Sequence, residues 1–228
     1  MRDTETYVII PVYNEDQIVA SVIKKIRKYY KNIICVNDGS SDDSSLHIVN
    51  SGGTLVEHPI NLGAGAATQT GVDYALQFPN SQYFITIDAD DQHDIKDAVK
   101  MLEYLKKYKL DIVFGSRFIG KVHNISRVKR VFLKQAALLS TKTSKVTLTD
   151  PHIGLRVFNR KFAENLKLTL PDFSHASEIL YRISEGNYKY AEIPVTVTYS
   201  DYSKSKGQPM LNAINITIDL LFHRIIKK

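Results

Sequence analysis

The chain has 228 residues, of which 43% are hydrophobic, and its formal net charge is +6. This length suits one large domain or two small ones, and the composition can support a substantial core. The single cysteine, Cys35, excludes an intramolecular disulfide framework and a zinc site built from several cysteines. The first residues lack the features of a signal peptide, and no apolar run is long enough to span a membrane, so we expect a cytoplasmic protein.

Strand-like and helix-like segments alternate through the first 117 residues. Apolar runs typical of strands lie at residues 7–13, 32–38, 52–59, 82–88 and 110–117. Segments with helical character lie between them, at residues 15–30, 63–76 and 95–105. The alternation predicts an α/β domain with a mostly parallel sheet that helices cover on both faces.

The pattern changes after residue 117. Residues 126–140 have the spacing of an amphipathic helix, whose apolar side holds Val128, Val131, Phe132, Ala136 and Leu139. We expect a strand at 153–159, a helix at 174–185, a strand at 188–199 and a final amphipathic helix at 209–228. The chain is therefore expected to form one domain over residues 1–208 with a C-terminal amphipathic extension over residues 209–228.

Polar side chains follow several of the expected strands at their carboxyl ends, where α/β sheets bind their ligands. Asp88 and Asp90 come directly after one apolar run, and Gln92 follows two residues later. A hard divalent cation prefers oxygen ligands, and Mg²⁺ is commonly held by one or two carboxylates plus substrate phosphates. These residues therefore predict a metal site. The alternative is a solvated acidic loop that caps a helix.

Two further segments have the composition of ligand-binding loops. In "NDGSSD" (37–42), Asp38 could accept hydrogen bonds from a ribose or a base, or it could belong to an ordinary turn with a helix cap. "NLGAGAATQTG" (61–71) has neither a Walker A lysine nor the third glycine of a Rossmann fingerprint. That disfavours an ATPase or a dehydrogenase, and the small residues could simply let a helix pack closely on the sheet.

Basic residues concentrate in two places. Residues 121–145 contain seven Lys or Arg and no Asp or Glu, and the last residues are "HRIIKK". Such patches attract phosphates, nucleic acid or anionic lipid, or they form a solvated helix face. Nucleic acid is not an expected partner, because stacking aromatic residues are not interleaved with the basic ones.

Several motifs together carry a resemblance to a known family. They are "IIPVYNE" (9–15), "VNDGSSD" (36–42), "NLGAGAATQTG" (61–71), "TIDADDQHD" (86–94), "FGSRF" (114–118) and "TDPHIGLRVFNR" (149–160). In this order and spacing they resemble glycosyltransferase family two, whose GT-A fold is a Rossmann-like, mostly parallel sheet with helices on both faces. Within that family the chain is most similar to polyprenyl-phosphate sugar transferases, such as the dolichol-phosphate mannose synthases.

The resemblance implies roles for residues of this sequence. A Mg²⁺ or Mn²⁺ ion would be held by Asp88, Asp90 and Gln92, and the donor pocket would include Pro11, Tyr13, Glu15, Asp38, Gly65 and Asp88. The acceptor phosphate would meet Arg117 with Arg127 or Arg130, and a mobile loop at 201–208 would include Ser203, Lys204 and Lys206. The expected catalytic residues are Asp90, Arg117 and Asp150. The lysine usual in the glycine-rich loop is Ala64 here, which leaves one donor contact open.

The expected activity is transfer of a sugar, with inversion, from a UDP- or GDP-sugar to a polyprenyl phosphate of the undecaprenyl or dolichyl type, for cell-surface glycan assembly. One alternative is transfer to a sugar hydroxyl of a growing polysaccharide, for which Asp150 is the candidate base. The alternative of another class is a nucleotide-sugar-binding module without turnover.

The C-terminal extension predicts where the protein works. Its apolar helical face consists of Leu211, Ile214, Ile218, Leu221, Phe222 and Ile225, and basic residues cluster at its end. Such a helix could lie in the interface of an anionic membrane, dock on the core, or bind a separate membrane subunit. We therefore expect a peripheral protein at the inner face of the membrane, and a homo-oligomer is possible.

Overall fold

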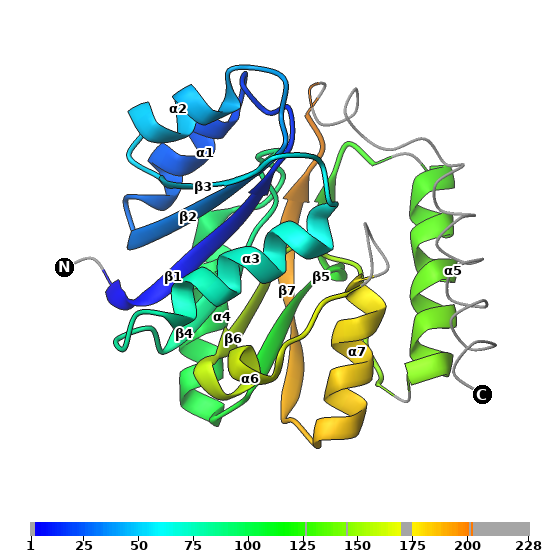
Figure 1. The fold of residues 1–228 in the computed structure, drawn as a ribbon. Coiled ribbons are helices and arrows are strands. Elements are labelled where there is room, and N and C mark those ends of the chain that lie inside the picture. Colours follow the sequence, from blue (N-terminus) through cyan, green and yellow to red (C-terminus); the bar gives the residue numbers. More distant parts are fainter. Residues whose placement is uncertain (1–2, 126, 145, 170–174, 201, 203–228) are drawn as a thin grey trace.

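The structure is a computed structural model that describes residues 3–125, 127–144, 146–169, 175–200 and 202 (Figure 1). Over these residues, one sheet is sandwiched between helices on both of its faces. The expected amphipathic extension at 209–228 lies outside the described residues, as does nearly all of the expected loop at 201–208.

The sheet has seven strands in the order β3-β2-β1-β4-β6-β5-β7. Each neighbouring pair is parallel except the two that contain β6, which runs antiparallel to β4 and to β5. The strands are β1 (Asp3–Val12), β2 (Tyr30–Asp38), β3 (Thr54–His58), β4 (Tyr83–Thr86), β5 (Ile112–His123), β6 (Arg156–Asn159) and β7 (Tyr190–Thr198). The predicted mostly parallel α/β sheet is confirmed.

Seven helices belong to the described part of the chain. They are α1 (Val19–Ile26), α2 (Ser44–Asn50), α3 (Ala64–Leu76), α4 (Ile95–Tyr108), α5 (Arg127–Ser144), α6 (Arg160–Asn165) and α7 (His175–Gly186). Apolar residues of α1 and α4 pack in one core, whereas those of α3, α6 and α7 pack in the other. Strand β1 lies between the two cores. Its Val8 and Ile10 face the first, and its Tyr7 and Ile9 face the second.

Helix α3 approaches the sheet closely. A Cβ atom added at Gly71 would lie 2.4 Å from Cγ2 of Ile9, and the neighbouring Ala67 and Ala75 are fully buried. Small residues in the segment 61–71 therefore serve, at least in part, to let this helix pack against β1. The helix consequently begins, at Ala64, beside the carboxyl ends of β1 and β2.

Some element boundaries differ from the sequence expectation. The first helix begins at Val19 rather than near residue 15, because Asn14 has a left-handed backbone (φ 54°) and residues 14–16 donate backbone hydrogen bonds to the loop after β2. Strand β4 ends at Thr86, two residues early. The short helices α2 and α6 were not expected as separate elements.

The predicted helix at 126–140 is present as α5, but its environment differs from that of a core helix. Among its described side chains, Ala137 is buried, whereas Val131 and Leu138 are exposed to 56% and 62%. These two residues are seven apart and share one helical face, so that apolar face lies at the surface. Within the described ranges, no helix is both long and apolar enough to cross a bilayer.

Candidate active site

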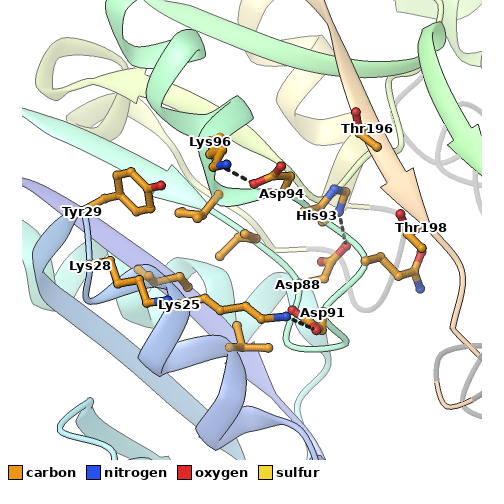
Figure 2. Close-up of a pocket in the computed structure, with 15 residues that line it drawn as sticks. Lys25, Lys28, Tyr29, Asp88, Asp91, His93, Asp94, Lys96, Thr196 and Thr198 are labelled. Atoms are coloured by element: carbon orange, nitrogen blue, oxygen red, sulfur yellow. Dashed lines mark hydrogen bonds and ion pairs between the residues drawn. The ribbon is translucent and has the colours of Figure 1, made fainter.

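An acidic loop connects the carboxyl end of β4 to the start of α4. Asp94 caps α4 by accepting a hydrogen bond from the backbone N–H of Lys96, at 2.9 Å. Asp91 has a left-handed backbone (φ 60°), and its carboxylate accepts from Nζ of Lys25 on α1 at 2.5 Å. Figure 2 shows these contacts around a cavity of about 450 Å³ that lies between α1, α4 and β7. The loop is thus braced at both of its ends.

The carboxylate of Asp88 packs against Gly154, which lies just before β6. A Cβ added at Gly154 would lie 2.0 Å from Oδ2 of Asp88, so any other residue at 154 would displace the carboxylate. Nε2 of His93 lies 3.3 Å from the same oxygen, and the Asp88 side chain is 52% exposed. Desolvation by the surrounding protein raises the pKa of Asp88. The hydrogen bond and charge of His93, with the charges of Arg156 and Arg117, outweigh that effect, so the pKa of Asp88 lies below its ordinary value.

Asp90 is the second carboxylate of the loop. It accepts hydrogen bonds from the backbone and the side-chain amide of Gln92. Burial, followed by the negative charge of Asp88, raises the pKa of Asp90 to about 6. Two carboxylates in this electrostatic relation form an oxygen-rich site in which a bound cation would relieve the repulsion.

The carboxylates do not form a complete metal cage. Among the residues that the structure describes, no group of three or more His, Cys, Asp or Glu side chains is placed to hold one ion. A cation at Asp88 and Asp90 would therefore keep coordination positions for oxygens from water or substrate, as Mg²⁺ sites that serve phosphates do.

The structure places Asp38 in a hydrogen-bond network, and its expected contact with the donor stays a prediction. Its buried carboxylate accepts from Nδ1 of His58 at 2.7 Å and from the backbone N–H groups of Leu62 at 2.9 Å and Gly63 at 2.8 Å. The other ring nitrogen of His58 lies 2.9 Å from Oγ1 of Thr70. Asp38 therefore joins the ends of β2 and β3 to the loop before α3.

A cavity of about 430 Å³ lies beside this cluster, at the ends of β2 and β3. Its lining is formed by Asn37, Gly39, Ser40, Glu57, His58 and Pro59. Gly39 has a φ of 71°, and a Cβ there would lie 2.5 Å from the carbonyl carbon of Ile60, so the turn requires glycine as the sequence suggested. Asn37 precedes Asp38 and carries the amide that faces this turn, since it accepts from the backbone of Ser40.

The loop after β1 borders the same region. Pro11 is partly buried and Tyr13 is exposed. Glu15 accepts a hydrogen bond from the hydroxyl of Tyr202, at 2.6 Å, across 187 positions of the chain. The segment that follows β7 therefore reaches the loop after β1. Of the other expected donor residues, Gly65 is buried in the first turn of α3, while Ser203, Lys204 and Lys206 lie outside the described residues.

Arg117 lies within β5, where the pairing with β7 shifts register after Ser116, and other residues hold its side chain in place. Its backbone N–H and its Nε donate to Oδ2 of Asp150 at 3.0 and 2.6 Å, and its Nη1 donates to the hydroxyl of Tyr199 at 2.7 Å. Glu192 on β7 in turn accepts from the backbone of Asp150 at 2.7 Å. Asp150 is buried, and its Oδ2 is occupied by the backbone and side chain of Arg117.

Arg127 and Arg130 are not brought to Arg117 by any contact among the described side chains. Arg127 opens α5, and its side chain is not described, while Arg130 is exposed on the same helix. The structure thus pairs Arg117 with Asp150, and the roles of Arg117 and of the second acceptor arginine stay predictions.

Comparison with known proteins decides the family. The model described as "Glycosyl transferase family 2" matches residues 7–167, which is most of the chain. This chain belongs to glycosyl transferase family 2. The glycosyltransferase is 26% identical over 249 residues to a UDP-N-acetylglucosamine–dolichyl-phosphate N-acetylglucosaminyltransferase of Methanococcus voltae, covering 100% of this chain and 99% of the relative.

Two more comparisons agree with that assignment. The glycosyltransferase is 26% identical over 220 residues to a polyprenol monophosphomannose synthase of Mycolicibacterium smegmatis, covering 90% of this chain and 82% of the relative. Its fold is similar to that of glucosyl-3-phosphoglycerate synthase from Mycobacterium tuberculosis, solved with Mn²⁺ and UDP-glucose, with a TM-score of 0.72 and 17% identity over 96% of this chain and 77% of that one. The expected GT-A fold and the expected class of enzyme are confirmed.

The structure also reveals a charged residue in this glycosyltransferase that the sequence analysis did not single out. Arg156 lies on β6, directly opposite Thr86 of β4 and Phe114 of β5, and only 3% of it is exposed. Burial lowers its pKa to about 10, so it stays charged at neutral pH. The available signal was the one cation inside the apolar run "IGLRVFN" (153–159), because a charge in a buried strand requires an explanation.

Proposed function

We propose that this glycosyltransferase moves a sugar from a nucleotide-sugar donor to a polyprenyl phosphate. The observation that carries the proposal is the state of Arg117. Its guanidinium is buried and oriented by Asp150 and Tyr199, and its Nη2 makes no hydrogen bond within the described part of the chain. A pre-oriented guanidinium suits a phosphate, and the neighbouring carboxylate is committed to holding it rather than to removing a proton.

Both relatives named above support this choice of acceptor. Their names describe transfer to dolichyl phosphate and synthesis of a polyprenol monophosphomannose. A lipid phosphate is already an anion near neutral pH, so one of its oxygens can attack the anomeric carbon without a base. The new bond joins that oxygen to the anomeric carbon. The bond from that carbon to the nucleoside diphosphate breaks on the opposite face, which inverts the configuration.

We propose that Asp88 and Asp90, with Gln92 beside them, hold a Mg²⁺ or Mn²⁺ ion together with the donor diphosphate. The raised pKa of Asp90 and the glycine at 154 that makes room for Asp88 both support this assignment. The ion would neutralise charge on the departing nucleoside diphosphate. The chain's own contribution is to brace the loop, through the contacts of His93 with Asp88 and of Lys25 with Asp91.

The donor nucleoside is proposed to bind at the cavity beside β2 and β3. Asn37, Ser40 and Glu57 supply polar groups there. We propose that Pro11, near the end of β1, and Tyr13, in the loop after it, contribute to the same donor site. Asp38 shapes this pocket from beneath instead of contacting the nucleotide. The hydrogen bond from Tyr202 to Glu15 brings the start of the expected mobile loop to the loop after β1. We propose that Ser203, Lys204 and Lys206, which follow in sequence, belong to that loop.

We propose a peripheral location at the inner face of the membrane. The exposed Val131 and Leu138 of α5, with the exposed Arg130 and Lys134, place apolar and basic groups on one helix, and this combination favours an anionic bilayer. Arg127 and Arg130 would then meet the lipid phosphate at the rim. A separate membrane subunit could take the place of direct contact.

A panel of radiolabelled donors tests the proposal. UDP- and GDP-sugars are offered with Mg²⁺ or Mn²⁺, first with undecaprenyl phosphate and then with soluble oligosaccharides. We expect a lipid-linked product from at least one donor, and its loss on chelation of the metal. Efficient transfer to a soluble sugar, with no lipid-linked product from any accepted donor, would overturn the proposal and return Asp150 to consideration as a base.

A further inference from the structure

Arg156 combines deep burial with a lack of hydrogen bonds. Only 3% of the residue is exposed, and its Nε is buried without a hydrogen-bond partner. Within the described ranges its guanidinium donates to no oxygen and forms no ion pair, although it has five N–H groups. Buried polar groups in folded proteins are almost always satisfied, so a buried arginine in this state calls for a specific reason.

The neighbouring carboxylates do not supply that reason. The charges that act on Arg156 are those of Asp88 and Asp150, with Arg117 opposing them. Asp150 is occupied by the backbone and Nε of Arg117, and Asp88 lies against His93 in the acidic loop. Both anions lower the cost of keeping Arg156 charged, yet neither contacts its donors. Among the described residues, no group accepts a hydrogen bond from these donors.

The position of Arg156 places it under the proposed site. It pairs across the sheet with Thr86, the last residue of β4, and Asp88 follows Thr86 by two residues. On its other side it pairs with Phe114 of β5, three residues before Arg117. The side chain thus lies between the strand that ends in the carboxylate pair and the strand that carries the anchored arginine.

We propose that Arg156 binds a phosphoryl group of a substrate, donating its unpaired N–H groups to phosphate oxygens in the centre of the site. This inference rests on the proposed function for the identity of the substrate, and it adds a second guanidinium to the anion site. A planar guanidinium presents paired donors that match two phosphate oxygens, and burial strengthens such contacts because water does not compete.

Two sources could supply the phosphoryl group. One is the diphosphate of the donor, and the other is the monophosphate of the lipid acceptor. A nucleoside diphosphate with Mg²⁺ and farnesyl phosphate, a short lipid monophosphate, are separate probes for the two. Binding of each can be measured by titration calorimetry without any turnover.

The test compares two variants with a matched control. Arg156→Met removes the charge and keeps an apolar side chain of similar length. Arg156→Lys keeps the charge but loses the paired N–H donors of the guanidinium. Arg160→Met is the control, because it removes an arginine whose hydrogen bonds stabilise the fold. Arg160 of α6 donates to the carbonyls of Leu76, Phe78 and Ser81. Replacing an unpaired buried charge by an apolar residue is often neutral or stabilising, whereas removing satisfied hydrogen bonds is destabilising.

We expect Arg156→Met to unfold at the wild-type temperature or above it and to bind at least one probe about 10- to 100-fold more weakly, with Arg156→Lys intermediate. Arg160→Met should unfold at a lower temperature and bind both probes normally. The probe that loses affinity identifies the source of the phosphoryl group. Wild-type affinity for both probes in Arg156→Met would overturn the inference; if that variant does not fold, the same result in Arg156→Lys would do so. Failure of the wild-type enzyme to modify a lipid phosphate would instead contradict the proposed function and leave the binding result in place.

Discussion

The two sides of the candidate site differ in how their polar groups are satisfied. On the side of β1, β2 and β3, where we propose that the donor binds, Asp38 accepts hydrogen bonds from His58 and from two backbone N–H groups. On the side of β5 and β6, Arg117 retains one free nitrogen and Arg156 retains all of its donors, among the described residues. The first side is a finished scaffold. We propose that a bound anion supplies the hydrogen-bond acceptors that the second side lacks.

The largest effect is expected at Asp88 and Asp90, which lie between the two sides of the candidate site. Asp90→Asn should abolish transfer, or lower kcat by about three orders of magnitude, because several kcal/mol of charge stabilisation is lost with the cation. Thermal unfolding should be unchanged, since Asp90 lies in a loop beyond the sheet. Asp88→Asn should behave in the same way, and near-wild-type turnover of either variant at saturating metal would remove the metal assignment.

The next effect concerns the unfinished side. Arg117→Lys keeps a cation for Asp150 but loses the contact with Tyr199 and the free Nη2, so it should raise the acceptor KM by about 10- to 100-fold. The donor KM should stay close to the wild-type value. Steady-state kinetics with each substrate varied in turn separates the two. An equal rise in both KM values would show that Arg117 does not distinguish the acceptor.

The finished side should respond through stability. Asp38→Ala leaves His58 and the backbone N–H groups of Leu62 and Gly63 without their acceptor, and we expect a loss of roughly 2–4 kcal/mol in the free energy of unfolding. Asp43→Ala is the matched control, because Asp43 is exposed and its side chain makes no cap hydrogen bond. Urea denaturation measures both variants. If Asp38→Ala is as stable as Asp43→Ala but binds nucleotide poorly, Asp38 contacts the donor after all.

The smallest effect is expected at the outer brace of the acidic loop. The pair between Lys25 and Asp91 is partly exposed, with 52% and 25% of the side chains accessible, so Lys25→Met should cost less than about 1 kcal/mol in unfolding free energy. It should still weaken Mn²⁺-dependent activation several-fold, because Asp91 holds a left-handed backbone between Asp90 and Gln92. Lys24→Met, on the exposed face of the same helix, should change neither quantity.

The sequence predicted the sheet and the acidic loop that follows β4, because both follow from local patterns. The apolar run before Asp88 locates the end of β4 to within two residues, whereas Arg117 lies inside β5, which continues to His123. Parallel strands bring their carboxyl ends to one edge of the sheet. The partners of Asp38 and the packing of Gly154 against Asp88 could not be predicted in this way. Those contacts join segments 20 to 66 positions apart, and their chemistry depends on which oxygen meets which donor.

Arg156 and α5 illustrate two other limits. Arg156 stood out in sequence only as one charge within a strand, and its lack of partners is visible only when the surrounding side chains are placed. The apolar residues of α5 predicted a helix correctly, but periodicity does not state what an apolar face meets, and Val131 and Leu138 face outward.

The central claim is that the acceptor is an anion that needs no base, and matched lipids test it most directly. The enzyme is offered undecaprenyl phosphate and undecaprenol, which differ only in the phosphate, with the same nucleotide-sugar and Mg²⁺, and the lipid products are identified by mass spectrometry. The account predicts a sugar phosphate lipid from the first and no glycosylated product from the second. Comparable glycosylation of undecaprenol, whose hydroxyl must lose a proton, would contradict it.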